Sequence, residues 1–173
     1  MHLDSIDTQL IDALQRDGKE ALARLGERVG LSAPSVLERL RKLERRGAIR
    51  GYHADVDGRA VGLDVTAFVG VSVGIGADLD AAENAVTAIR GVTECHHVTG
   101  GHTLLLKVKT ENTETLERFI RKLRAVPGIV QTETMVALST TLERGPLALP
   151  DPHMGGKRSR RSKSRLEAGQ PAE

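Results

Sequence analysis

Apolar residues in the first fifty positions recur at the three- and four-residue spacing of amphipathic helices. This spacing predicts a leading helix at residues 4–17 and two shorter helices within residues 20–47. Gly30 supplies a turn of positive φ between the two shorter helices, and Ser32 is placed to cap the second of them. Gly26 leaves room for this pair to pack closely. Three short helices with a tight glycine turn predict a helix-turn-helix bundle.

The second helix of the pair turns a polar, basic face away from its apolar stripe. Between residues 39 and 50 the chain carries six cations and the single acid Glu44, although its formal net charge is only +2. Such a local concentration indicates contact with nucleic-acid phosphate, and a merely solvated helix face is the alternative interpretation. A helix of this kind in the major groove would contact base edges through Ser35, Glu38, Arg39 and Lys42. Phosphate contacts are expected from Arg41, Arg45, Arg46 and Arg50.

From residue 65 the apolar pattern changes from helical spacing to alternation, which predicts strands. Residues 48–56, before this point, are expected to be extended, either as a wing or as a strand leading out of the bundle. The predicted order is strand, helix, strand, strand, helix, strand, with strands at about 65–75, 92–99, 103–109 and 129–138. This order is that of a ferredoxin-like βαββαβ sandwich, in which both helices cover one face of the sheet. The fold class is therefore α+β.

The uncovered face of this sheet is expected to meet a second subunit, because its strands carry apolar residues on successive positions. A two-fold dimer would set two helix-turn-helix units on one duplex, so the DNA site should be roughly palindromic. These assignments divide the chain into a DNA-binding domain at residues 1–57, a linker at 58–64, a ferredoxin-like domain at 65–142 and a basic tail at 143–173.

The tail differs from the rest of the chain. Its basic run, residues 157–165, carries six cations and no acid, and it shows no apolar periodicity. We expect such a segment to be disordered. It either binds phosphate without sequence preference or only aids solubility.

The amino-acid composition and the absence of certain motifs disfavour several classes of function. Aromatic residues make up 2% of the chain, which disfavours single-stranded nucleic acid, whose bases stack on aromatic rings. The sequence shows no apolar run of membrane-spanning length and no signal peptide, so a cytoplasmic protein without a membrane partner is expected. The G-x-S-x-G, P-loop and H-E-x-x-H motifs do not occur, so neither enzymatic activity nor a cofactor is expected.

One cysteine and two histidines could in principle approach one another: Cys95, His97 and His102. A metal site needs three or four such ligands that converge, and no C-x-x-C pair strengthens the case. Ordinary half-buried strand residues are the favoured interpretation, so no metal is expected. The lone cysteine excludes an internal disulfide and fits a reducing compartment.

Several passages together resemble one family. The opening LDSIDTQLIDALQRDGK, the phrase VGLS, the run VLERLRKLERRGAIRGY, and the later ECHHVTG and VPGIV are similar to the Lrp/AsnC group of bacterial and archaeal regulators, also called feast/famine regulators. The resemblance spans about residues 3–140. It implies a winged helix-turn-helix domain, a ferredoxin-like effector domain, homodimers that often assemble into octamers, and transcription controlled by small molecules, usually amino acids. The alternative from another class is a stand-alone small-molecule-binding allosteric module that acts through protein partners.

The resemblance also implies an effector site near the turn between the second and third strands of the effector domain. The matching positions are Gly100, Gly101, His102 and Thr103. Amino-acid responders of the family commonly carry a glycine followed by an acid, an aromatic and a second acid there, and this chain lacks both acids and the aromatic. The ammonium group of an amino acid would therefore lack its anionic partner at the turn. An amino acid remains the leading effector, a different ligand or none is the alternative, and a weak or absent response to leucine is expected.

Overall fold

The computed structural model describes residues 3–150, and these form two compact units. The first unit combines the residues up to His53 with those from Arg144 onward, and the second unit comprises Ala54–Glu143. The chain therefore passes between the units twice. No helix in the described range is long and apolar enough to cross a membrane.

The sequence predicts a linker and a basic tail beside the two domains. The linker expected at residues 58–64 lies within the second unit, where a short 3-10 turn, η1 (Arg59–Val61), precedes the sheet. The basic run of the tail, residues 157–165, lies outside the described residues.

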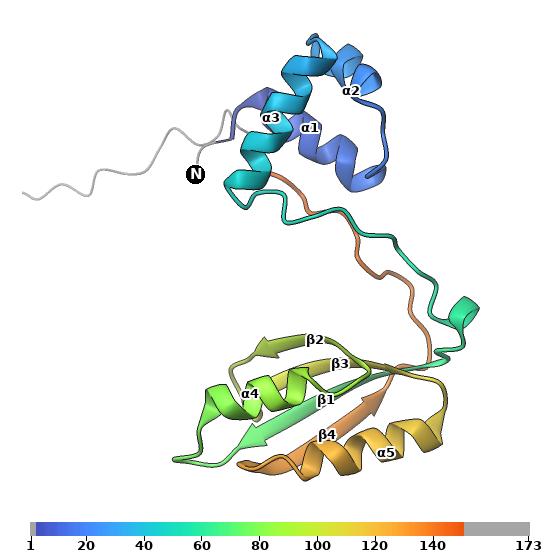
Figure 1. Ribbon diagram of the computed structural model, residues 1–173. Coiled ribbons are helices and arrows are strands. Elements are labelled where there is room, and N and C mark those ends of the chain that lie inside the picture. The colour runs from blue at the N-terminus through green and yellow to red at the C-terminus, as the bar shows by residue number, and fades with distance from the viewer. Residues whose placement is uncertain (1–2, 151–173) are drawn as a thin grey trace, which may run out of the picture. The chain divides into compact units, whose positions relative to one another are not determined.

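Three helices build the first unit, as the apolar spacing predicts (Figure 1): α1 (Ser5–Arg16), α2 (Leu22–Val29) and α3 (Ala33–Arg45). Asp4 caps α1 by accepting a hydrogen bond from the N–H of Asp7 at 2.8 Å. Ser32 caps α3 in the same way, through the N–H of Ser35. The three apolar stripes meet in one small core, made of the buried residues Leu10, Ala13, Leu25, Val36, Leu40 and Leu43.

Two glycines shape the turn between α2 and α3. Gly30 follows α2 in the left-handed region, with φ at 68°, a conformation that side-chain-bearing residues rarely adopt. A Cβ atom on Gly26 would lie 2.4 Å from the carbonyl oxygen of Leu31, closer than a side chain can approach. The packing of α3 against α2 therefore depends on glycine at both positions.

The segment after α3 takes neither of the two forms that the sequence leaves open. Residues 50–56 are extended, but they pair with no strand among the described residues. A β-ladder needs a second strand, and the described part of the first unit contains none. Tyr52 holds the segment instead, because its hydroxyl donates to the Glu44 carboxylate at 3.1 Å. The expected wing is therefore not a β-hairpin in the part of the chain that the structure describes.

The second unit is an antiparallel four-stranded sheet with two helices (Figure 1). Its elements follow the predicted order: β1 (Val65–Val73), α4 (Leu79–Thr87), β2 (Val92–His97), β3 (Leu104–Thr110), α5 (Thr113–Arg124) and β4 (Ile129–Val136). The strands lie in the order β2-β3-β1-β4, and each neighbouring pair is antiparallel. Two interleaved βαβ halves of this kind are the predicted ferredoxin-like sandwich, which confirms the α+β fold class.

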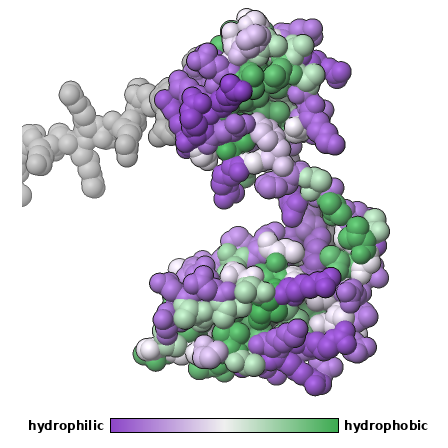
Figure 2. Space-filling model, viewed as in Figure 1, coloured by the Kyte–Doolittle hydropathy of each residue, from purple (hydrophilic) through white to green (hydrophobic). Residues whose placement is uncertain are grey.

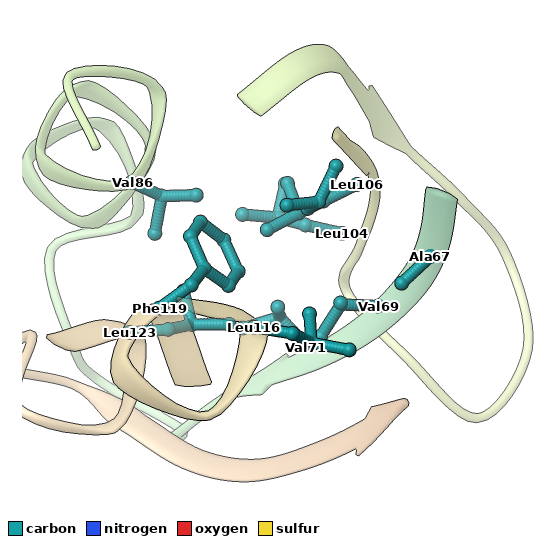
Figure 3. Close-up of a cluster of buried hydrophobic side chains, with 10 residues drawn as sticks. Ala67, Val69, Val71, Val86, Leu104, Leu106, Leu116, Phe119 and Leu123 are labelled. Atoms are coloured by element: carbon teal, nitrogen blue, oxygen red, sulfur yellow. The ribbon is translucent and has the colours of Figure 1, made fainter. Parts of the chain in front are cut away.

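Phe119 of α5 fills the centre of the core of this unit, between the two helices and the sheet (Figure 3). Alternate residues of β1 and β3 face it, as the period of a strand requires. From the side shown in Figure 2, apolar residues of the unit reach the surface only in patches between polar ones. The core consists of Ala67, Val69, Val71, Val86, Leu104, Leu106, Val108, Leu116, Phe119 and Leu123.

No helix of the described chain covers the opposite side of the sheet, which we call the open sheet face. Phe68 of β1 is 37% exposed there, and its neighbour across the β1–β4 ladder, Met135, is 47% exposed. Lys107, the neighbour of Phe68 on β3, contacts Glu94 at 3.2 Å and Glu143 at 2.5 Å. The open sheet face thus mixes exposed apolar side chains with ion pairs.

Candidate DNA-binding surface and effector turn

Helix α3 presents a polar face that holds the predicted base contacts. Ser35, Glu38 and Lys42 are exposed and lie three and four residues apart, so their side chains project from one side of the helix. The Ser35 hydroxyl shares a 2.9 Å hydrogen bond with that of Ser32, at the start of the helix. The side chains of Glu38 and Lys42 have no ion pair or hydrogen bond within the described residues. They are therefore available to a ligand.

Arg39, the fourth predicted base contact, is already engaged. Its Nη1 donates to Asp4 Oδ2 at 2.7 Å and to Asp7 Oδ1 at 2.8 Å. These bonds raise the pKa of Arg39. Burial pushes the pKa of Asp4 upward, but the Asp7 N–H and the Arg39 guanidinium outweigh it and leave that pKa below its ordinary value of 3.8. The guanidinium thus ties α3 to the start of α1.

The predicted phosphate contacts surround the same face. Arg41, Arg45 and Arg46 are exposed toward the end of α3, and Arg50 is exposed just beyond it. None of the four has an ion pair among the described residues, and Glu44, the one acid between them, accepts the hydroxyl of Tyr52. Uncompensated positive charge therefore flanks Glu38 and Lys42, as phosphate binding requires.

The turn between β2 and β3, where the resemblance places the effector, is held against β1. The N–H of Thr103 donates to the Val71 carbonyl at 2.8 Å, and Thr103 Oγ1 accepts the N–H of Val73 at 3.1 Å. Gly100 has φ at 114°, which favours glycine. A Cβ atom on Gly100 or Gly101 would meet nothing within 4 Å. The backbone of the turn is therefore open to an approaching small molecule.

His102 folds back from this turn over Gly70 of β1. A Cβ atom at residue 70 would lie 2.4 Å from the imidazole, so the ring occupies space that only glycine leaves. Its Nε2 lies 2.9 Å from the Glu133 carboxylate of β4, and its Nδ1 lies 3.4 Å from the Ser72 hydroxyl. We call Ser72, His102 and Glu133 the effector-turn cluster. The sequence of the turn itself contains no acid, because Glu133 comes from a different strand.

Cys95 and His97 do not join His102. They lie on the helix-facing side of β2, where the carboxylate of Glu83 in α4 is 2.5 Å from His97. Burial, and then the charge of Glu83, raises the pKa of the Cys95 thiol. His102 lies on the open sheet face, over Gly70. Within residues 3–150, no three His, Cys, Asp or Glu side chains are grouped to hold a metal ion.

Two family models match the chain over successive stretches. The AsnC-type helix-turn-helix domain matches residues 3–44, and the Lrp/AsnC ligand binding domain matches residues 66–147. The chain belongs to the Lrp/AsnC family. This Lrp/AsnC protein is accordingly a helix-turn-helix transcriptional regulator with a ligand-binding domain.

Curated relatives of this Lrp/AsnC protein support the same conclusion. The chain is 34% identical over 141 residues to the HTH-type transcriptional regulator FL11 of Pyrococcus horikoshii. The aligned region covers 82% of this chain and 93% of the relative. It is 31% identical over 150 residues to the leucine-responsive regulatory protein of Escherichia coli. This alignment covers 85% of this chain and 92% of the relative.

Solved structures of the family superpose on this Lrp/AsnC protein. Bacillus subtilis LrpC is 34% identical with a TM-score of 0.72, over 81% of this chain and 97% of LrpC. A Neisseria meningitidis transcriptional regulator in complex with L-methionine is 27% identical with a TM-score of 0.81, over 88% of this chain and 99% of the regulator. A Mycobacterium tuberculosis feast or famine regulatory protein complexed with L-methionine is 32% identical with a TM-score of 0.77, over 82% of this chain and 95% of that protein.

Proposed function

We propose that this Lrp/AsnC regulator binds a specific, roughly palindromic site on double-stranded DNA as a homodimer, and that a small-molecule effector, foremost an amino acid, modulates this binding. The observation that carries the proposal is the exposed face of α3, where Glu38 and Lys42 have no partner within the described residues and unpaired arginines surround them. Polar side chains on such a helix discriminate bases while the flanking cations hold the phosphate backbone. The regulator acts in the cytoplasm, where bacterial and archaeal DNA lies.

Within this surface we assign the base contacts to Ser35, Glu38 and Lys42. Glu38 can accept a hydrogen bond from the amino group of a cytosine, and Lys42 can donate to the acceptors of a guanine. The phosphate contacts are assigned to Arg41, Arg45, Arg46 and Arg50.

Arg39 receives a different role from the one that its helical face alone indicates. It can reach a base only by leaving Asp4 and Asp7, and Asp7 is 7% exposed. Leaving a buried carboxylate without its cation is unfavourable. We therefore assign Arg39 to positioning α3 on α1 rather than to base contact.

The open sheet face supports a dimer. Alongside Phe68 and Met135, the chain that follows β4 exposes Leu138 at 93% and Leu142 at 78%. Packing these side chains against a second copy removes apolar surface from water. A two-fold pair of subunits brings two α3 helices to one duplex, which is the symmetry of a palindromic site.

Two observations support an amino-acid effector: the ligands of related proteins and the geometry of the turn. The Neisseria and Mycobacterium relatives are complexed with L-methionine. In this chain the Glu133 carboxylate lies beside the turn and is 60% exposed, so it can meet an ammonium group. The open backbone at Gly100 and Gly101 can approach the rest of the ligand.

Selection of bound duplexes from a random DNA pool by the full-length protein tests the proposal. We expect one palindromic sequence to be enriched and to bind far more tightly than a scrambled duplex of the same composition. A stand-alone allosteric module that acts through protein partners would enrich no sequence. Failure to enrich any sequence, with the protein folded, would therefore refute the proposed function.

A further inference from the structure

An apolar-walled groove of the second unit lies where the start of β2, the end of β3 and α5 come together. It encloses about 450 Å³, within the range of small-molecule sites. Its apolar wall includes Ile89, Val92 and Phe119, and its lining also contains the cations Arg90, Lys109, Arg118 and Lys122.

The cations that line this groove differ in whether they already have an ionic partner. Arg118 donates to Glu114 at 3.0 Å, one turn earlier on α5, and Lys109 donates to Glu143 at 3.1 Å, so both are already paired. Arg90 and Lys122 have no ion pair or hydrogen bond of their side chains within residues 3–150. Glu111 is the one acid on the wall of the groove. Two of the cations that line this apolar groove are thus unpaired among the described residues.

The groove borders a position where close strand packing favours glycine, and it is separate from the effector turn. Gly91 has φ at 105°, and a Cβ atom there would lie 3.1 Å from the Lys109 carbonyl oxygen. The β2–β3 ladder shifts register between Val92 and Glu94, an irregularity of the kind that often borders binding sites. The groove is lined by the first residues of β2 and the last of β3, whereas the effector turn joins the other ends of these two strands.

We propose that this groove is a second small-molecule site, for organic acids that combine one carboxylate with a compact apolar body. The carboxylate pairs with Arg90 and Lys122, and the apolar body packs against Ile89, Val92 and Phe119. Charge-assisted bonds at the mouth set the orientation, while apolar burial supplies affinity. Because α5 and the strands β2 and β3 border the groove, a ligand here contacts the same sheet as the effector turn without sharing a residue with it.

Isocaproate is a suitable probe, since it is a branched chain with a single carboxylate, and its amide is the neutral match. We expect titration of the ¹⁵N-labelled full-length protein with isocaproate to shift the amide signals of Gly91 and Thr93, and isocaproamide to bind roughly tenfold or more weakly. The double variant Arg90→Gln/Lys122→Gln should weaken isocaproate binding by a similar factor.

Arg121→Gln is the matched control. Arg121 lies next to Lys122 on α5 but is 75% exposed and pairs with Glu117, so isocaproate affinity should equal that of the parent protein. All three variant positions are on the surface, and the fold should persist. The proposal is overturned if the shifts centre on Gly100–Thr103, if the amide binds as well as the acid, or if the double variant binds as the parent does.

Discussion

Arg39 and Lys42 lie one turn apart on α3 and carry the same charge, yet their surroundings differ. Arg39 contacts two carboxylates at the start of α1, and its side chain is 30% exposed. Lys42 is exposed, and its side chain has no partner among the described residues. The sequence shows that both cations share the outward part of the helix. It does not show which carboxylate, more than thirty positions earlier, lies within bonding distance of one of them.

Replacing Arg39 with alanine should destabilise the first unit. The Asp7 carboxylate would remain buried without its cation, at a cost of about 1–2 kcal/mol, since part of the arginine side chain is exposed and screened. Chemical denaturation followed by circular dichroism measures this change in stability. Arg39→Lys should be less destabilising, because an ammonium can still pair with one carboxylate. Unchanged stability together with weaker discrimination at one base pair would show instead that Arg39 contacts DNA.

At the scale of the elements, local sequence patterns predict the individual helices and strands. They do not predict which distant segments pair with one another. The helices α1 to α5 and the four strands follow from apolar spacing, capping residues and glycines, and the βαββαβ order follows from their succession. Residues 50–56 have the composition of a strand, but strand formation needs a partner, and none lies within the described first unit. Glu133 likewise reaches His102 only because β4 lies beside β1 in the sheet.

The effector turn should bind leucine weakly or not at all, because Gly101 and Thr103 carry no carboxylate and the nearby Glu133 carboxylate is already paired with His102. Calorimetric titration of the full-length protein with leucine and methionine measures this. An amino acid that does bind should depend on Glu133, so Glu133→Gln should reduce its affinity roughly tenfold. Glu117→Gln, on the exposed side of α5, is the control and should leave it unchanged. Tight leucine binding would contradict this account of the turn.

At the scale of the whole molecule, the open sheet face should determine the oligomeric state. Met135→Asp would put an unpaired charge beside Phe68 within the proposed interface, which is strongly unfavourable when buried. Light scattering should then report a monomer, while Met135→Leu should remain a dimer. Because Met135 is 47% exposed in the single chain, the thermal unfolding of the variant subunit should stay cooperative. A folded variant that is still dimeric would mean that the interface lies elsewhere.

The chain also returns to the first unit after the effector domain. The side-chain amide of Gln15 in α1 donates to the Leu147 carbonyl at 3.2 Å and accepts the Leu147 N–H at 2.6 Å. The residues that lead to the basic run at 157–165 are therefore attached to the DNA-binding unit.

Removing residues 150–173 should weaken DNA binding without changing the preferred sequence. Six cations with no acid among them can displace counterions from any duplex, and contacts to phosphate carry no sequence information. The slope of log affinity against log salt should become shallower by roughly 0.9 for each DNA phosphate that the tail no longer neutralises. An unchanged slope would favour a tail that only aids solubility.

The central claim is that α3 distinguishes one DNA sequence from another. Fluorescence anisotropy of Lys42→Ala and Arg45→Ala, on the selected duplex and on its scrambled counterpart, tests it most directly. We predict that Lys42→Ala weakens binding to the selected duplex by about 1–3 kcal/mol and binding to the scrambled one much less. Arg45→Ala should weaken both by the same factor, as a phosphate contact does. If Lys42→Ala binds both duplexes as the parent does, or is weakened equally on both, Lys42 is not a base contact and the proposed recognition surface is contradicted.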